Sequence, residues 1–156
     1  MKPVKVVVDT NVFISAFFHN DKSAQALLRY SQENKIKFCF SKDTNDELYY
    51  IFGEMIEKFF GSFKTAKIME RFGRLVYFSE KVEHNTKTNY SEDKSDNKFI
   101  DCCIDGNIKY LISEDFHIEN VRDFEKEIKK EYGLEIKILS PLQFSMEMLK
   151  LKFITK

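Results

Sequence analysis

The sequence predicts an α/β fold, a three-layer α/β/α sandwich on a mainly parallel sheet of about five strands. A short apolar run, Val6–Val8, ends at a turn, which is typical of a buried strand in a parallel sheet. Segments with strand patterns alternate along the chain with segments of helical spacing. A second apolar run, Lys109–Ile112, also ends just before acidic residues. Together these observations favour a parallel sheet with polar groups at its carboxyl edge.

The first half of the chain alternates strand and helix. The first strand ends at Asp9, and helices are expected over Val12–Phe18 and again with Ser23 as a cap. The alternating stretch Lys35–Phe40 predicts the second strand. A long helix is expected over Ser41–Phe60, because apolar residues recur there at helical spacing: Leu48, Ile51, Phe52, Met55, Ile56 and Phe59.

The second half repeats this alternation. A helix is predicted over Phe63–Arg74, which forms an arm with the preceding helix, and a short strand over Leu75–Phe78. The polar stretch Glu83–Ser95 is expected to be a loop. A helix over Asp96–Ile104 follows, with Gly106 placed to stop it. The remaining expected elements are a strand at Lys109–Ile112, one or two charged helices over Ile118–Tyr132, a strand at Glu135–Leu139 and a helix that opens with Pro141.

Length and composition set limits on the kind of protein. The 156 residues, 43% of them hydrophobic, suit one domain over residues 1–156. The 25 basic and 25 acidic residues balance, so any nucleic-acid site must be local. Three cysteines without a CxxC pair favour reduced thiols. The N-terminus reaches charge too soon for a signal peptide, and no apolar run approaches ~18 residues. We expect a cytoplasmic protein that does not enter a membrane.

Four acids stand where a parallel sheet gathers its ligands. Asp9 and Asp115 follow predicted strands, whereas Glu47 and Asp96 lie near the starts of helices. Each has a simpler interpretation: Asp9 as a helix cap, Glu47 as a solvated acid favoured by the helix dipole, Asp96 as a helix N-terminal acid and Asp115 as a turn residue. Asp96, however, shares a face with Phe99, which points it toward the sheet.

The four acids taken together favour metal binding. Clustered carboxylates repel one another unless a cation neutralises them or some stay protonated. Sites made only of oxygen ligands suit Mg²⁺ or Mn²⁺. Two such ions about 3.5 to 4 Å apart are able to activate water and stabilise the leaving oxygen in phosphodiester cleavage. Hydrolysis of a nucleic acid is therefore the expected reaction.

Four stretches in series resemble PIN-domain ribonucleases, and more narrowly the bacterial PIN-family toxins of toxin-antitoxin pairs, the VapC-like ribonucleases. The stretches are VVVDTNVFISAF (6–17), SKDTNDEL (41–48), EDKSDNKFIDCCIDGNIKYLISED (92–115) and ILSPLQF (138–144). The resemblance implies a compact α/β/α sandwich with a parallel sheet and an acidic pocket for Mg²⁺ or Mn²⁺. It also implies an RNA substrate, a protein antitoxin and a homodimer.

The resemblance assigns residues as well. Asp9, Glu47, Asp96 and Asp115 match the metal-binding acids of the family. Supporting residues are also implied: Asn11 matches a polar residue that fixes the pocket by hydrogen bonding, and Ser113 falls where a small hydroxyl residue is usual. Two positions differ from the family pattern, because His117 replaces a frequent acid and Lys94-Ser95 replaces Pro-Asp.

Other polar residues near these acids have secondary roles. His117 is a candidate for contact with metal-bound water or RNA phosphate, whereas His19 and His84 are expected at the surface. Because Asp101 lies about 140° around the helix from Asp96, we expect it to be outer or solvated. Asp93 is a further secondary acid. The lysines near the acids are either solvated or hold RNA phosphates: Lys42, Lys94 and Lys98.

The sequence hypothesis is a metal-dependent endoribonuclease with Asp9, Glu47, Asp96 and Asp115 as ligands and general-base support. An alternative is a PIN-like module that binds RNA or protein without cutting it. A phosphoacceptor signalling domain fits less well, since that arrangement needs adjacent acids after the first strand and a Lys beyond the last, where Ser140-Pro141 stands. Glycine-rich nucleotide-binding motifs are absent from the sequence.

Overall fold

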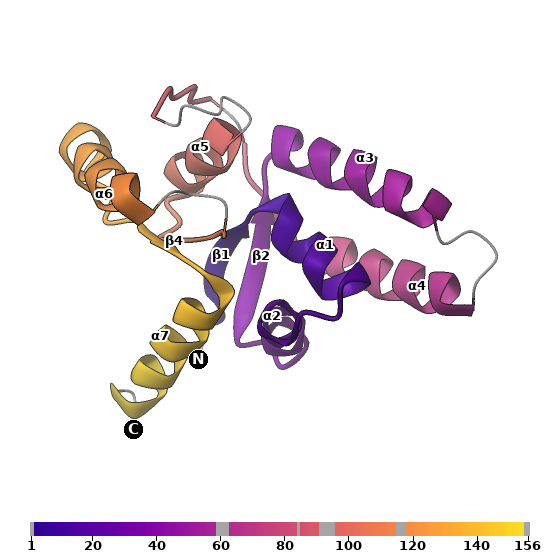
Figure 1. Ribbon diagram of the computed structural model, residues 1–156. Helices are drawn as coiled ribbons and strands as arrows, with labels where there is room; N and C mark the ends of the chain where they lie inside the picture. The colour runs from indigo at the N-terminus through magenta and orange to yellow at the C-terminus, as the bar shows by residue number, and fades with distance from the viewer. Residues whose placement is uncertain (1, 59–62, 84, 91–95, 115–117, 155–156) are drawn as a thin grey trace.

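A computed structural model describes residues 2–58, 63–83, 85–90, 96–114 and 118–154 of the chain. Each strand is followed along the chain by one helix or by two (Figure 1). The elements, in order, are β1 (Val4–Val8), α1 (Thr10–Phe18), α2 (Lys22–Gln32), β2 (Ile36–Phe40), α3 (Lys42–Lys58), α4 (Phe63–Tyr77), β3 (Glu80–Lys81), α5 (Asn97–Gly106), β4 (Tyr110–Ile112), α6 (Ile118–Tyr132), β5 (Lys137–Leu139) and α7 (Pro141–Ile154).

The strands of the described chain form one five-stranded sheet in the order β3-β2-β1-β4-β5. All of its neighbouring strands are parallel, and β1 lies at the centre, where Val6 pairs with Phe38 of β2 and with Tyr110 of β4. The predicted fold class, a three-layer sandwich with a parallel sheet of about five strands, is confirmed. Since β1 is covered on both faces, its continuous Val run is the pattern expected of such a strand.

Two hydrophobic cores lie on opposite faces of the sheet because successive side chains of a strand alternate. Val6 and Val8 join the core that contains Phe13, Leu27, Leu48 and Phe144. Figure 1 shows α1, α2, α3, α4 and α7 around that side and α5 and α6 on the other.

Val7 faces the second core instead. It packs there with residues of α5 and α6, among them Phe99, Cys103 and Ile128. The strand is thus buried on both faces, and Asp9 follows directly where β1 leaves the sheet.

The arm predicted from the two central helices is present. Phe72 of α4 stacks on Phe52 of α3 with ring centroids 3.9 Å apart, and Phe17 of α1 meets both rings edge-on. The strand predicted at Leu75–Phe78 is wrong, since α4 continues to Tyr77 and buries Leu75, and β3 begins only at Glu80. A short apolar run does not by itself distinguish strand from helix.

Helix ends differ in detail from the predicted caps. The α2 helix is capped by Asp21, whose Oδ1 accepts the Ala24 N–H at 3.1 Å, rather than by Ser23. The α5 helix runs through Gly106 and ends at Asn107, which takes the left-handed conformation at φ 52°. Asn tolerates this conformation better than most residues. Asn107 therefore ends the helix, one residue after Gly106, which was expected to do so.

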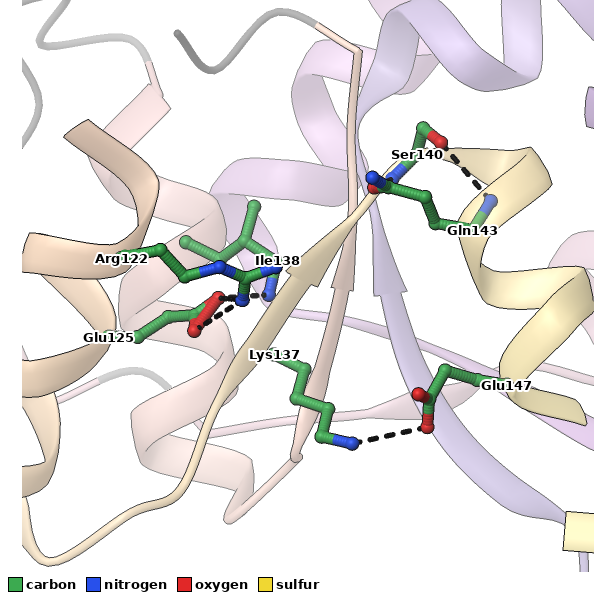
Figure 2. Close-up of polar contacts among 7 residues, drawn as sticks. All are labelled: Arg122, Glu125, Lys137, Ile138, Ser140, Gln143 and Glu147. Atoms are coloured by element: carbon green, nitrogen blue, oxygen red, sulfur yellow. Dashed lines mark hydrogen bonds and ion pairs between the residues drawn. The ribbon is translucent and has the colours of Figure 1, made fainter. Parts of the chain in front are cut away.

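The edge strand β5 is held from both sides (Figure 2). Glu125 of α6 accepts the outward-facing N–H of Ile138 at 3.2 Å, which covers part of the exposed edge of the sheet, and it also binds Arg122. Lys137 pairs with Glu147 of α7 at 3.2 Å. Ser140 and Gln143 exchange the reciprocal bonds of a capping box, which fixes the start of α7 as Pro141 predicts.

The cysteines match their predicted state. Cys39, Cys102 and Cys103 are free and buried. They act as small apolar groups on the α5 side of the sheet. Among the helices that the structure describes, none is long and apolar enough to cross a lipid bilayer.

Candidate functional site

The centre of the candidate site is the switch point of the sheet, where the direction in which the chain adds strands reverses. From β1 the chain builds β2 and β3 on one side, and it later returns to place β4 on the other side of β1. In open parallel sheets, ligands bind outside the carboxyl ends of the strands at such a switch point. Asp9 follows β1 and Ser113 follows β4, so these two residues mark the switch point in this chain.

Asp9 is held rigidly there. Its side chain is buried, with 3% of the residue exposed. Oδ2 accepts a hydrogen bond from the Ser113 hydroxyl at 2.8 Å, and Oδ1 accepts the backbone N–H of Asn11 at 3.3 Å. The Asp9 N–H donates to the Ile112 carbonyl at 2.9 Å, which extends the pairing of β1 with β4.

Asp9 therefore caps α1, as its simpler interpretation proposes, and also presents a carboxylate at the sheet edge. Each carboxylate oxygen can accept more than one bond, so the capping role and a ligand role are compatible in one side chain. Asn11 contributes its backbone amide to the binding of Asp9, and the residue itself is exposed.

Glu47 is neutralised by a lysine. It lies in the second turn of α3, as predicted, and forms an ion pair with Lys98 in the first turn of α5. Both side chains are about four-fifths buried, with 20% of Glu47 and 21% of Lys98 exposed. The Lys98 ammonium also lies 5.8 Å from the centroid of the Phe99 ring. This pair joins the helices that carry two of the predicted acids.

Asp96 directly precedes α5 and is half-buried. The residues that were expected to share its face, Phe99, Ile100 and Cys103, are buried, with 1%, 0% and 0% exposed. The helix thus packs on the sheet with the predicted face.

Several predicted residues lie outside the described part of the chain: Asp115, His117, Asp93, Lys94 and His84. Among the described residues, no three His, Cys, Asp or Glu side chains are grouped so that they could hold a metal ion. The structure therefore brings Asp9 to Ser113 and Glu47 to Lys98. The four-acid site stays a prediction.

Asp101 does not have its expected position. We expected an outer or solvated residue, but it is 5% exposed and its Oδ1 accepts the Thr88 N–H at 2.8 Å. One turn later, Asp105 accepts the N–H groups of Asn85 and Thr86 at 2.9 and 3.1 Å. The segment 85–90, which we call the strap, thus covers the face of α5 that helical geometry alone assigns to solvent.

The strap is also joined to α6, since the hydroxyl of Tyr90 contacts Glu131. The other secondary residues behave as ordinary surface groups. His19 is exposed, as expected. Lys42 is 84% exposed and pairs with Asp46, which is 61% exposed. Of the two described lysines considered as phosphate contacts, only Lys98 is held close to a predicted acid.

The donor set fits a divalent cation. Asp9 and Glu47 supply carboxylate oxygens of the hard type that Mg²⁺ and Mn²⁺ prefer. Glu47 is already paired with one cation, the ammonium of Lys98. Sequence reasoning named Lys98 but missed its partner. The two residues are 51 positions apart, and no local pattern relates them.

Comparisons with known proteins agree with this fold. A family model described as PIN domain matches residues 5–117. An uncharacterised protein of Methanocaldococcus jannaschii is 29% identical over 146 residues, which are 92% of this chain and 91% of that protein.

Among solved structures, the crystal structure of VapBC2 from Rickettsia felis, bound to a DNA fragment from their promoter, aligns with a TM-score of 0.50 and 15% identity. The alignment covers 86% of this chain and 98% of that one. At this level of identity the likeness shows the fold alone.

Proposed function

The chain belongs to the PIN domain family, and on this basis we propose that it is a metal-dependent endoribonuclease that hydrolyses RNA phosphodiester bonds. PIN domains are generally nucleases. One observation carries the finer proposal: a buried carboxylate, Asp9, is held by the Ser113 hydroxyl at the switch point of the sheet. Metal-ligating carboxylates are themselves hydrogen-bonded by neighbouring groups, and open parallel sheets bind ligands at this place, so the arrangement supports a metal-binding role for Asp9.

In this proposal Asp9, Glu47, Asp96 and Asp115 hold Mg²⁺ or Mn²⁺. The ion supplies activated water at neutral pH and stabilises the charge that develops on the phosphate. Ser113 orients Asp9 by donating to Oδ2, and the Asn11 amide fixes Oδ1. The buried faces of β1 and α5 support this proposal, because they fix the backbone next to Asp9 and Asp96.

An RNA cleavage assay tests the proposal. Purified wild-type protein is expected to cut RNA internally with Mn²⁺ and to stop when EDTA is added. Asp96→Asn is expected to lose this activity, because the amide oxygen and NH₂ group replace a charged ligand. Asp46→Asn is the matched control, since Asp46 is an exposed acid next to Glu47 that pairs with Lys42. Equal loss in both variants, or cleavage that persists in EDTA, would contradict the proposal.

We also propose a toxin role with a protein antitoxin as inhibitor. The likeness to VapBC2 supports an antitoxin partner. A groove of about 760 Å³ in this chain supports a partner of acidic, amphipathic character. Apolar and basic side chains of α1, α2, β2 and α4 line it, and no acidic residue is among the described lining: Phe17, Leu28, Arg29, Ile36, Lys37, Arg71, Arg74, Leu75 and Phe78, with five polar or aromatic residues around them.

The test of this role uses the product of the reading frame adjacent to this one. If that product is an antitoxin, it inhibits cleavage, and Arg71→Glu relieves inhibition without changing cleavage by the free protein.

A homodimer is proposed as well. Leu142, Met146 and Leu149 form an exposed apolar stripe on α7, 55 to 61% exposed, that supports it. Sedimentation of Met146→Glu against wild type tests that face.

A non-cutting binding module remains the second candidate. The observation that favours it is the ion pair of Glu47 with Lys98, which occupies a predicted metal ligand. This candidate predicts RNA binding that is the same in Mn²⁺ and in EDTA, with no cleavage in either. The cleavage assay above separates it from the nuclease.

A further inference from the structure

The Lys98–Glu47 ion pair differs from the surface ion pairs of this protein. Its side chains are 21% and 20% exposed, whereas those of Lys42 and Asp46 are 84% and 61% exposed. The pair also spans two helices, α3 and α5, that are distant in sequence. A carboxylate that is four-fifths buried is stabilised by a counter-ion, and Lys98 is the counter-ion that the structure shows for Glu47.

We infer that Lys98 is a resident counter-ion that competes with the divalent metal for Glu47, so that the metal must displace the ammonium when it binds. The inference rests on the proposed function, because it takes Glu47 as a metal ligand. In the chain without metal, Lys98 satisfies Glu47. With metal bound, the Glu47 carboxylate would serve the ion in place of the ammonium.

The chemistry of lysine suits this role. Its ammonium is a point charge on a flexible stem of four carbons, so it can leave one carboxylate by rotating the side chain while the helix stays in place. The main chain of α5 is fixed against the sheet by Phe99 and Ile100, which are buried. Displacement therefore involves the side chain and leaves the fold unchanged. Its cost is subtracted from the affinity of the site for the metal.

Isothermal titration of the full chain with Mn²⁺ tests the competition. Lys98→Met keeps the length of the side chain and removes its charge. It is expected to bind Mn²⁺ about fivefold more tightly than wild type, which is the ratio that corresponds to a pair at the upper end of the usual strength. Lys137→Met is the matched control. Lys137, on β5, also pairs with a largely buried carboxylate, that of Glu147 on α7, but neither residue is a predicted metal ligand. It is expected to bind like wild type.

A double-mutant cycle separates competition at Glu47 from a general effect of charge. If Lys98 acts through Glu47, Lys98→Met has little effect on Mn²⁺ affinity in a Glu47→Gln background. If the effect is the same in both backgrounds, the lysine acts at a distance and the inference is overturned. Equal affinities of wild type and Lys98→Met would overturn it as well.

A measurement on the wild-type chain serves if Lys98→Met does not fold. In an NMR titration with diamagnetic Mg²⁺, the Lys98 side-chain Hε and Cε resonances are expected to shift with saturation, while those of Lys137 stay in place. If other resonances shift with saturation while the Lys98 side-chain resonances do not, the inference is contradicted. Metal binding, and with it the proposed nuclease function, would still stand. If neither wild type nor Lys98→Met binds metal, the proposed function fails instead.

Discussion

The Ser113 hydroxyl donates a 2.8 Å hydrogen bond to Oδ2 of Asp9, which joins residues that are 104 positions apart in the sequence. The bond closes the switch point between β1 and β4, and both residues are buried, with 3% and 5% exposed. Because the backbones of these strands are already paired up to Val8 and Ile112, the side-chain bond continues the pairing one residue beyond the sheet. The consequence is a carboxylate with a fixed orientation.

Ser113→Ala tests the orientation of Asp9. Loss of the donor is expected to lower the free energy of unfolding by about 1.5 to 3 kcal/mol, since the bond it makes is to a buried carboxylate. The affinity for Mn²⁺ is expected to fall about tenfold, as for other residues that orient a metal ligand. Urea unfolding and Mn²⁺ titration measure the two effects. Ser140→Ala, which removes the cap of α7, serves as the control and is expected to change stability alone. Unchanged Mn²⁺ affinity in Ser113→Ala would argue against an orienting role.

Asp101→Ala tests the strap. Asp101 is buried and accepts the Thr88 N–H, so its loss leaves that amide without its carboxylate partner. We expect about 1.5 to 3 kcal/mol of destabilisation, the usual range for a hydrogen bond to a charged group. Hydrogen exchange at Thr88 is expected to speed up while exchange in β1 changes only with global stability. The same exchange rate at Thr88 in both proteins would show that the carboxylate does not hold the strap.

Phe72→Ala tests the packing of the arm. The Phe72 ring stacks on Phe52 and meets Tyr49 and Phe17 at their edges, and 8% of the residue is exposed. Its truncation is expected to cost about 3 kcal/mol, the lower end for a buried aromatic residue. Tyr77→Ala, at an 81% exposed position of the same helix, is expected to stay within about 0.5 kcal/mol of wild type. Chemical denaturation of both variants measures the difference, and similar losses would contradict the packing described.

Buried thiols predict a loss of stability in alkali. Burial raises the pKa of Cys39 from 9.0 to about 12 and that of Cys102 from 9.0 to about 11. A folded pKa above the unfolded value gives stability that is complete below pH 9, and this stability is lost as pH rises toward the folded pKa. Between pH 9 and 10.5 the free energy of unfolding is expected to fall by about 1 to 2 kcal/mol for each thiol.

Cys39→Ala is the variant that checks the alkaline effect. It is less stable at neutral pH, because a buried side chain is truncated, but its stability is expected to decline less steeply above pH 9. Urea unfolding at several pH values gives both slopes. Parallel slopes for wild type and variant would show that the Cys39 thiol stays neutral in the unfolded chain or ionises in the folded one.

Local patterns predicted the elements that carry Asp9 and Asp96. Val6–Val8 and the spacing of Phe99, Ile100 and Cys103 are strong signals, because burial on one or both faces dictates the residue types. Strand order is different. No local pattern states that β4 pairs with β1, so the bond from Ser113 to Asp9 was reachable only through the family resemblance and the general rule for switch points.

The errors have the same physical origin. Asp101 was expected to be outer or solvated because helical geometry describes only the helix itself. The strap covers that face of α5 through Thr88, which is 13 positions from Asp101 in the sequence. The apolar pattern of Leu75–Phe78 is compatible with either a strand or a helix turn. The helix forms because Leu75 packs into the core as part of α4. The pairing of Glu47 with Lys98 depends on how α3 and α5 lie together, which is likewise a property of the folded chain.

The most direct test of the account compares Mn²⁺-dependent RNA cleavage by wild type and Asp9→Asn at matched folded concentrations. The substitution keeps the shape of the side chain and its ability to accept from Ser113, but removes the charge. Cleavage is predicted to fall by about a hundredfold or more. Loss of a metal ligand is expected to have a larger effect than loss of a residue, such as Ser113, that orients the ligand. The thermal unfolding temperature serves as the check on folding. Cleavage at the wild-type rate by a folded Asp9→Asn protein would contradict the central claim that Asp9 holds the catalytic metal.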